Sequence, residues 1–145
     1  MSTNKILAQF GLVRRQLNRL GMIYLKEINI GPKQMLLLRF VNKHGQCTMT
    51  DISSGIGSDK ASVTRMVNSL VEATCLKLTY NKDDHRVVFV SLGAKAKKLI
   101  PHIERIYGQL SKDFAGSLPV GEQTKLLTTL KSIESHLQKT IKESI

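Results

Sequence analysis

The stretch SDKASVTRMVNSLVEATCLKLTYNKDDHRVVFVSL, residues 58–92, decides the fold. In its first half, Val63, Met66, Val67 and Leu70 recur at helical spacing, which predicts a helix with one buried face. In its second half, apolar and polar residues alternate on both sides of a polar turn, which predicts a β-hairpin. The stretch therefore predicts a helix followed at once by a hairpin.

The outward face of this helix carries small side chains beside one arginine and one asparagine, a composition that suits close approach to a DNA major groove. The hairpin tip ends in Arg86, and a narrow minor groove attracts arginine. We therefore expect double-stranded DNA as the partner. The candidate DNA-binding residues are Ser58, Lys60, Ser62, Thr64, Arg65, Asn68, Lys82, Asp84, His85 and Arg86.

Each of these assignments has a structural alternative. Asp84 and Arg86 would also form a solvated ion pair on any exposed turn, and Lys82 would also suit an ordinary turn. Arg65 would also pair with Asp59 or Glu72 on its own helix.

The chain before residue 58 predicts three helices. An apolar seam from Ile6 to Ile28 predicts a long first helix, which Gly31-Pro32 interrupts. Pro32 begins a second helix that runs to about His44. A brief helix follows over 50–56, with Thr50 as its cap. Gly57-Ser58 then forms the turn, with Ser58 capping the next helix.

The chain after residue 92 predicts two more helices with long apolar seams. The first runs from Ala96 to Phe114, and Pro101 inside it predicts a kink or a later start. The second begins near Pro119. Both carry more apolar surface than a helix standing alone would expose.

Composition and charge favour a polyanionic partner. The 145 residues are 41% hydrophobic, with 22 basic against 11 acidic residues and a net charge of +11. Residues 1–98 hold 16 of the basic and 6 of the acidic residues, so the positive field belongs to the part with the helix and hairpin. The alternative is a basic protein without a nucleic-acid partner.

Other classes of protein fit poorly. Cys47 and Cys75 have neither redox nor zinc spacing, and we interpret them as reduced thiols. The four histidines show no metal-ligand pattern, and no catalytic motif is present, so we expect no cofactor and no enzyme. Arginines interrupt the apolar residues near the N-terminus, and no run is long enough to span a bilayer, so we expect a cytoplasmic protein without a membrane partner.

Residues 50–99, TDISSGIGSDKASVTRMVNSLVEATCLKLTYNKDDHRVVFVSLGAKAKKL, resemble the MarR family of transcription regulators, and the order of elements resembles it over nearly the whole chain. The resemblance rests on Val63-Thr64-Arg65, Asp84-x-Arg86 and Val90-x-Leu92. It implies a mainly α fold with a small β-hairpin (α+β). Asp59 to Glu72 would be the recognition helix, and the hairpin tip the wing, where Asp84 orients Arg86.

The resemblance also implies a single domain, 1–145. A winged helix-turn-helix lobe would span 32–92, with dimerisation helices at 1–28 and 94–145. A homodimer would bind a pseudo-palindromic operator as a regulator, in the role of a repressor. A small phenolic or anionic effector would release it, and Arg14, Arg15 or Arg39 would meet an anionic group.

Three positions depart from the family pattern. Cys75 stands where the family usually has a glycine, which predicts a left-handed backbone there or a different helix end. Gly93 replaces the usual capping threonine, and Ala96 replaces a glycine.

Two other functions remain alternatives to an operator-binding regulator. A sequence-indifferent packing protein would bind unrelated duplexes equally well. A winged-helix protein-interaction module would bind none, even at low salt.

Overall fold

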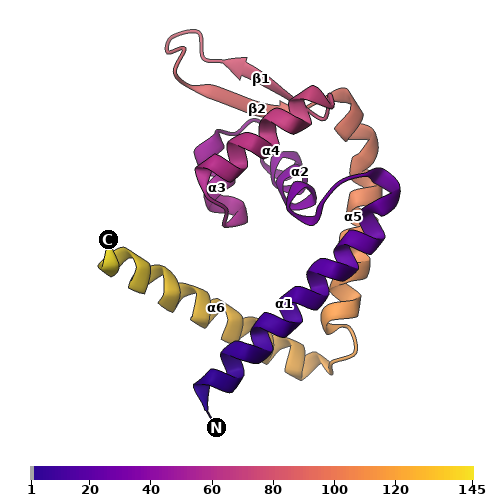
Figure 1. Cartoon of the computed structure of the whole chain (residues 1–145), viewed down its shortest axis with the longest axis vertical. Coiled ribbons are helices and arrows are strands. Elements are labelled where there is room, and N and C mark those ends of the chain that lie inside the picture. The colour runs from indigo at the N-terminus through magenta and orange to yellow at the C-terminus, as the bar shows by residue number, and fades with distance from the viewer. Residues whose placement is uncertain (1) are drawn as a thin grey trace. The chain divides into compact units, whose positions relative to one another are not determined.

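The computed structural model describes residues 2–145 and divides them into two compact units, one ending at Leu110 and the other comprising Ser111–Ile145. It confirms a mainly α-helical chain with one β-hairpin (Figure 1). The elements are α1 (Thr3–Leu25), the 3-10 helix η1 (Lys26–Ile28), α2 (Pro32–His44), α3 (Met49–Ile56), α4 (Lys60–Glu72), β1 (Leu76–Tyr80), β2 (Val88–Leu92), α5 (Ala94–Ala115) and α6 (Val120–Ser144).

The core of the first unit lies where α2, α3, α4 and the hairpin meet. Val63 and Val67 of α4 are fully buried, as their spacing predicts, and Leu70 is nearly so. They pack with buried side chains from α2, α3 and β2. This packing fixes which face of α4 points to solvent.

The first helix is shorter than its apolar seam predicts. The α-helix ends at Leu25, and the chain continues as one 3-10 turn to Ile28. Asn29 then takes a left-handed conformation with φ 54°, which asparagine tolerates better than most residues. This turn places Ile30 in the core.

Both helices of the helix-turn-helix are capped by residues other than those predicted. Thr48, and not Thr50, caps α3: its hydroxyl accepts from Asp51 N at 3.1 Å while the Asp51 carboxylate accepts from Thr48 N at 3.0 Å. Asp59, and not Ser58, caps α4. The predicted left-handed glycine is confirmed at Gly57, with φ 65°.

The end of α4 corrects the prediction made for Cys75. The left-handed residue is Thr74, with φ 60°, while Cys75 is buried. Thr74 N donates to Val71 O at 3.0 Å, and Cys75 N donates to Leu70 O at 2.8 Å. These two bonds form a Schellman motif, which satisfies carbonyl groups at the helix end. The left-handed position of this motif, occupied here by Thr74, is usually a glycine.

The hairpin is antiparallel, and its register runs from the pair Leu76–Leu92 to the pair Tyr80–Val88. Cys47 adds a short bridge on the other side of β2, because Val90 N donates to Cys47 O at 2.7 Å. This bridge ties the start of the helix-turn-helix to the wing.

Gly93 is required by packing at the end of β2. A Cβ atom at this position would overlap the carbonyl oxygen of Thr74. Glycine therefore suits this close approach of the two backbone segments.

The two C-terminal helices form as predicted, with one correction. α5 begins at Ala94 and includes Pro101, so the expected later start is wrong. In α6 the structure describes no buried residue. Within residues 2–145, every helix is too short or too polar to span a lipid bilayer.

Candidate nucleic-acid interface

The first turn of α4 holds Arg65 through a chain of hydrogen bonds. Ser62 N donates to Asp59 Oδ1 at 2.7 Å, and Ser62 Oγ donates to Asp59 Oδ2 at 2.9 Å. Arg65 Nη2 donates to the same hydroxyl at 3.1 Å. Arg65 is therefore linked to Asp59 through the Ser62 hydroxyl, and not by the direct ion pair that the sequence offered as an alternative.

These contacts keep Asp59 ionised. The amide and hydroxyl of Ser62 hold the pKa of Asp59 below its ordinary value, and the positive charges of Arg65 and Lys33 lower it further. An ionised cap stabilises the positive end of the helix dipole. Arg65 is exposed, so its remaining donors are accessible to a partner.

The rest of the α4 surface has the predicted small, polar character. Lys60, Thr64 and Asn68 are exposed. The Thr64 hydroxyl donates to Lys60 O at 2.9 Å, which leaves its methyl group and oxygen lone pairs available. Ser58 and Ser62 are half-buried, and the Ser58 carbonyl accepts from Ser53 Oγ.

The wing tip holds Arg86 in a two-pronged ion pair with Asp84. Arg86 Nε donates to Asp84 Oδ1 at 3.0 Å, and Nη2 donates to Oδ2 at 3.3 Å. The amide of Arg86 also donates to Oδ1, at 3.1 Å. These bonds hold the pKa of Asp84 below its ordinary value. The Arg86 side chain is nonetheless 91% exposed, so a partner can reach it.

Asn81 shapes the turn that carries this pair, a role that the sequence reasoning missed. Its Oδ1 accepts from Asp83 N at 2.8 Å and from Asp84 N at 3.3 Å. Asparagine directly before a charged turn is a recognisable signal for such an Asx turn. Lys82 and His85 are exposed on the same tip.

The two parts of the candidate surface belong to one structural unit. α4 packs against β1, and the hairpin turn extends beyond the helices (Figure 1). The exposed cations Lys60 and Arg65 are on α4, and Lys82 and Arg86 are on the hairpin turn. This arrangement offers hydrogen-bond donors and positive charge to a polyanion.

Arg39, considered from the sequence for an anionic ligand, already has partners. Its guanidinium bonds Glu104 of α5, with Nε to Oε1 at 2.9 Å and Nη2 to Oε2 at 3.3 Å. It also lies 3.5 Å from the ring centroid of Tyr107. The pair and the ring contact join α2 to α5.

Comparison with known proteins finds a matching family model and two similar regulators. Residues 28–87 match the model described as MarR family. The HTH-type regulator YfiV of Bacillus subtilis (strain 168) is 27% identical over 73 residues, which span 50% of this chain and 46% of YfiV. The HTH-type regulator BilQ of Clostridioides difficile (strain CD3) is 24% identical over 105 residues, 70% of each chain. The chain thus matches about half the length of the first of these relatives.

Solved structures share the fold. A mutant of MarR from E. coli, complexed with operator DNA, has a TM-score of 0.82 at 22% identity, covering 89% of this chain and 93% of that one. BpsR of Bordetella bronchiseptica, whose DNA binding is regulated by 6-hydroxynicotinic acid, has a TM-score of 0.83 at 16% identity, covering 90% and 98%. The regulator SlyA has a TM-score of 0.84 at 18% identity, covering 92% and 94%.

Proposed function

We propose that this chain is a MarR-type repressor that binds a pseudo-palindromic operator as a homodimer, and the match of residues 28–87 to the MarR family model supports this. Each copy places α4 in the major groove and the wing in the adjacent minor groove. The two half-site centres lie about one DNA turn apart.

The observation that carries this proposal is the arginine at the wing tip. Arg86 is exposed, and its hydrogen bonds to Asp84 hold the guanidinium in one position before any partner arrives. A pre-positioned guanidinium loses less conformational freedom when it enters a narrow groove. The additional bond from the Arg86 amide fixes the position of the Asp84 carboxylate at the turn.

On α4, we assign base recognition to Arg65 and Asn68, whose side chains match purine edges in the major groove. Ser62 and Thr64 flank them with little bulk. Lys60, Lys82 and His85 contact phosphates. Ser58 contributes to DNA binding from the turn between α3 and α4.

Dimer formation is supported by apolar side chains that the single chain leaves exposed. On α1, Ile6 and Phe10 are each 54% exposed. On α6, Leu127, Leu137 and Ile141 are exposed to a similar degree. Apolar stripes of this kind mark surfaces that another protein surface covers, and a two-fold partner would cover both.

Release by a small effector is the remaining part of the proposal. It is supported by BpsR, with 6-hydroxynicotinic acid, and by the organohalide-sensing regulator RdhR, crystallised with 2,4-dichlorophenol, which has a TM-score of 0.83 at 20% identity. Arg14 and Arg15 of α1 are exposed and would suit an anionic group.

The test is selection of bound fragments from the source genome, followed by affinity measurements on the selected duplex. We expect binding that weakens steeply with salt and an Arg86→Ala variant about tenfold weaker at moderate salt. Lys139→Ala, an exposed cation on α6, is the control and should bind like the unmodified protein.

The same experiment separates the alternatives. Equal affinity for unrelated duplexes at matched salt would indicate a packing protein. Failure to bind any duplex at low salt would indicate a protein-interaction module. Unchanged affinity of Arg86→Ala would reject the wing assignment.

A further inference from the structure

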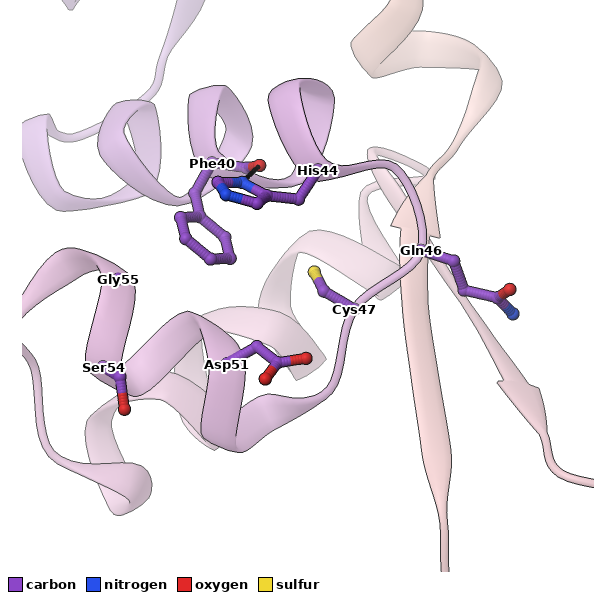
Figure 2. Close-up of a pocket in the computed structure, with 7 residues that line it drawn as sticks. All are labelled: Phe40, His44, Gln46, Cys47, Asp51, Ser54 and Gly55. Atoms are coloured by element: carbon purple, nitrogen blue, oxygen red, sulfur yellow. Dashed lines mark hydrogen bonds between the residues drawn. The ribbon is translucent and has the colours of Figure 1, made fainter.

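A groove of about 550 Å³ lies between α2 and α3 and shares no residue with the proposed DNA surface. Figure 2 shows its lining, which includes Phe40, His44, Cys47, Asp51, Ser54 and Gly55. A space of this size accommodates a small organic molecule. The chemistry of the lining indicates which class of molecule it fits.

One wall of the groove is aromatic. The rings of Phe40 and His44 stack with centroids 4.0 Å apart and planes 23° from parallel. The Phe40 ring points toward α3, and the His44 ring folds back along α2 beside it (Figure 2). Gly55 of α3 makes this possible, because a Cβ atom there would overlap the Phe40 ring. A flat ligand would therefore meet two stacked rings rather than flexible aliphatic chains.

The polar groups of the groove are mixed in character: Gln46 and Ser54 can donate hydrogen bonds, while His44 and Asp51 supply acceptors. His44 Nδ1 lies 2.9 Å from Phe40 O, and since a carbonyl only accepts, Nδ1 must carry the hydrogen. In the neutral ring, Nε2 is then an acceptor. The bonds from the Thr48 amide and hydroxyl hold the pKa of Asp51 below its ordinary value, so this carboxylate is negative at neutral pH.

The remaining features of the groove disfavour anions and covalent chemistry. Neither lysine nor arginine occurs among the described residues that line it. Burial, followed by the negative charge of Asp51, raises the pKa of the Cys47 thiol. Cys47 is therefore a protonated, polarisable contact and not a nucleophile.

We propose that this groove binds small aromatic cations. The ligand ring lies against Phe40 and His44, and its charged nitrogen donates to Asp51. This hydrogen bond joins a cation to a carboxylate and is therefore stronger than one between neutral groups. This site is separate from the DNA surface. Because α3 packs against α4, any effect of the ligand on operator binding would rest on the proposed function.

The probe is benzamidine, with benzoate as a matched anion of similar size, added to the full chain without DNA. Backbone amide signals in two-dimensional NMR report the site. We expect benzamidine to shift the Phe40, His44 and Gly55 signals saturably, with a Kd on the order of 1 mM. Benzoate should leave these signals in place.

Asp51→Asn keeps an acceptor for the Thr48 amide but removes the charge, and should weaken benzamidine about tenfold. Glu134→Gln removes an exposed carboxylate from α6 and should bind benzamidine normally. Absence of saturable shifts with benzamidine, or equal shifts with benzoate, overturns the proposal on the unmodified protein alone. Undiminished binding by Asp51→Asn overturns the role of the carboxylate. None of these results bears on operator binding, since no DNA is present.

Discussion

Asp84 should affect operator binding in two opposite ways: its negative charge repels DNA, but its hydrogen bonds orient Arg86. Substituting Asp84 shows which of these effects is larger. Asp84→Asn removes a negative charge from a surface proposed to meet a polyanion. Long-range electrostatics alone would then strengthen operator binding. The same change removes the charged partner that holds the guanidinium at 3.0 Å and 3.3 Å. Arg86 would then need to be ordered during binding.

We expect the loss of order to dominate. Ordering one long side chain during binding weakens affinity by about two- to tenfold. The gain from removing one exposed charge is smaller at physiological salt, because solvent and ions screen it. Asp84→Asn should therefore bind the selected operator more weakly than the unmodified protein does. Fluorescence anisotropy titrations at fixed salt measure the difference.

Asp83→Asn is the matched control. Asp83 neighbours Asp84 on the same exposed tip, and the substitution makes the same change in charge. It leaves the bonds to Arg86 intact, so its operator affinity should equal or slightly exceed that of the unmodified protein. If Asp84→Asn bound as tightly as Asp83→Asn, orientation of Arg86 by Asp84 would have no part in binding.

Three further predictions concern stability. Thr74→Gly should raise the free energy of unfolding by about 1 kcal/mol in urea titrations, because glycine adopts the left-handed conformation at φ 60° without strain; a decrease would contradict the strain argument. Gly93→Ala should lower it by about 2 kcal/mol, since the new Cβ overlaps Thr74 O, and unchanged stability would show that the two segments separate freely. The caps Asp51 and Asp59 have depressed pKa values in the folded chain. The stabilisation that the two carboxylates give the folded chain is complete above their pKa in the unfolded chain, about 3.9, and is lost as the pH falls through their lower pKa in the folded chain. The urea concentration at the midpoint of unfolding should therefore decrease as the pH is lowered from about 5 to about 2. In the Asp51→Asn and Asp59→Asn variants the urea midpoint should decrease less over this pH range. An equal decrease would show that these two carboxylates are not its cause.

The fold was largely readable from the sequence because its signals are local. Helical spacing in α4 and alternation in the hairpin each follow from a few neighbouring residues, and the structure confirms both. The caps were misplaced by one or two positions, because Thr48 and Thr50 have the same chemistry. Only the backbone path decides which of them bonds Asp51.

Features that depend on contacts between distant segments could not be read in this way. Gly93 faces Thr74 across the chain, and the ring of Phe40 fills the space beside Gly55. A glycine inside α3 was the one available signal for that close approach. The ion pair of Arg39 with Glu104 likewise joins residues 65 positions apart.

Arg65 is the residue through which α4 is proposed to read base sequence, and Arg65→Ala removes that contact. The affinities to compare are those for the selected operator and for a scrambled duplex of equal length, at the same salt. The unmodified protein should prefer the operator by about a thousandfold or more. Arg65→Ala should lose at least about tenfold of that preference, while its affinity for the scrambled duplex falls only slightly. An Arg65→Ala variant that keeps the full preference would show that α4 does not read base sequence through this residue.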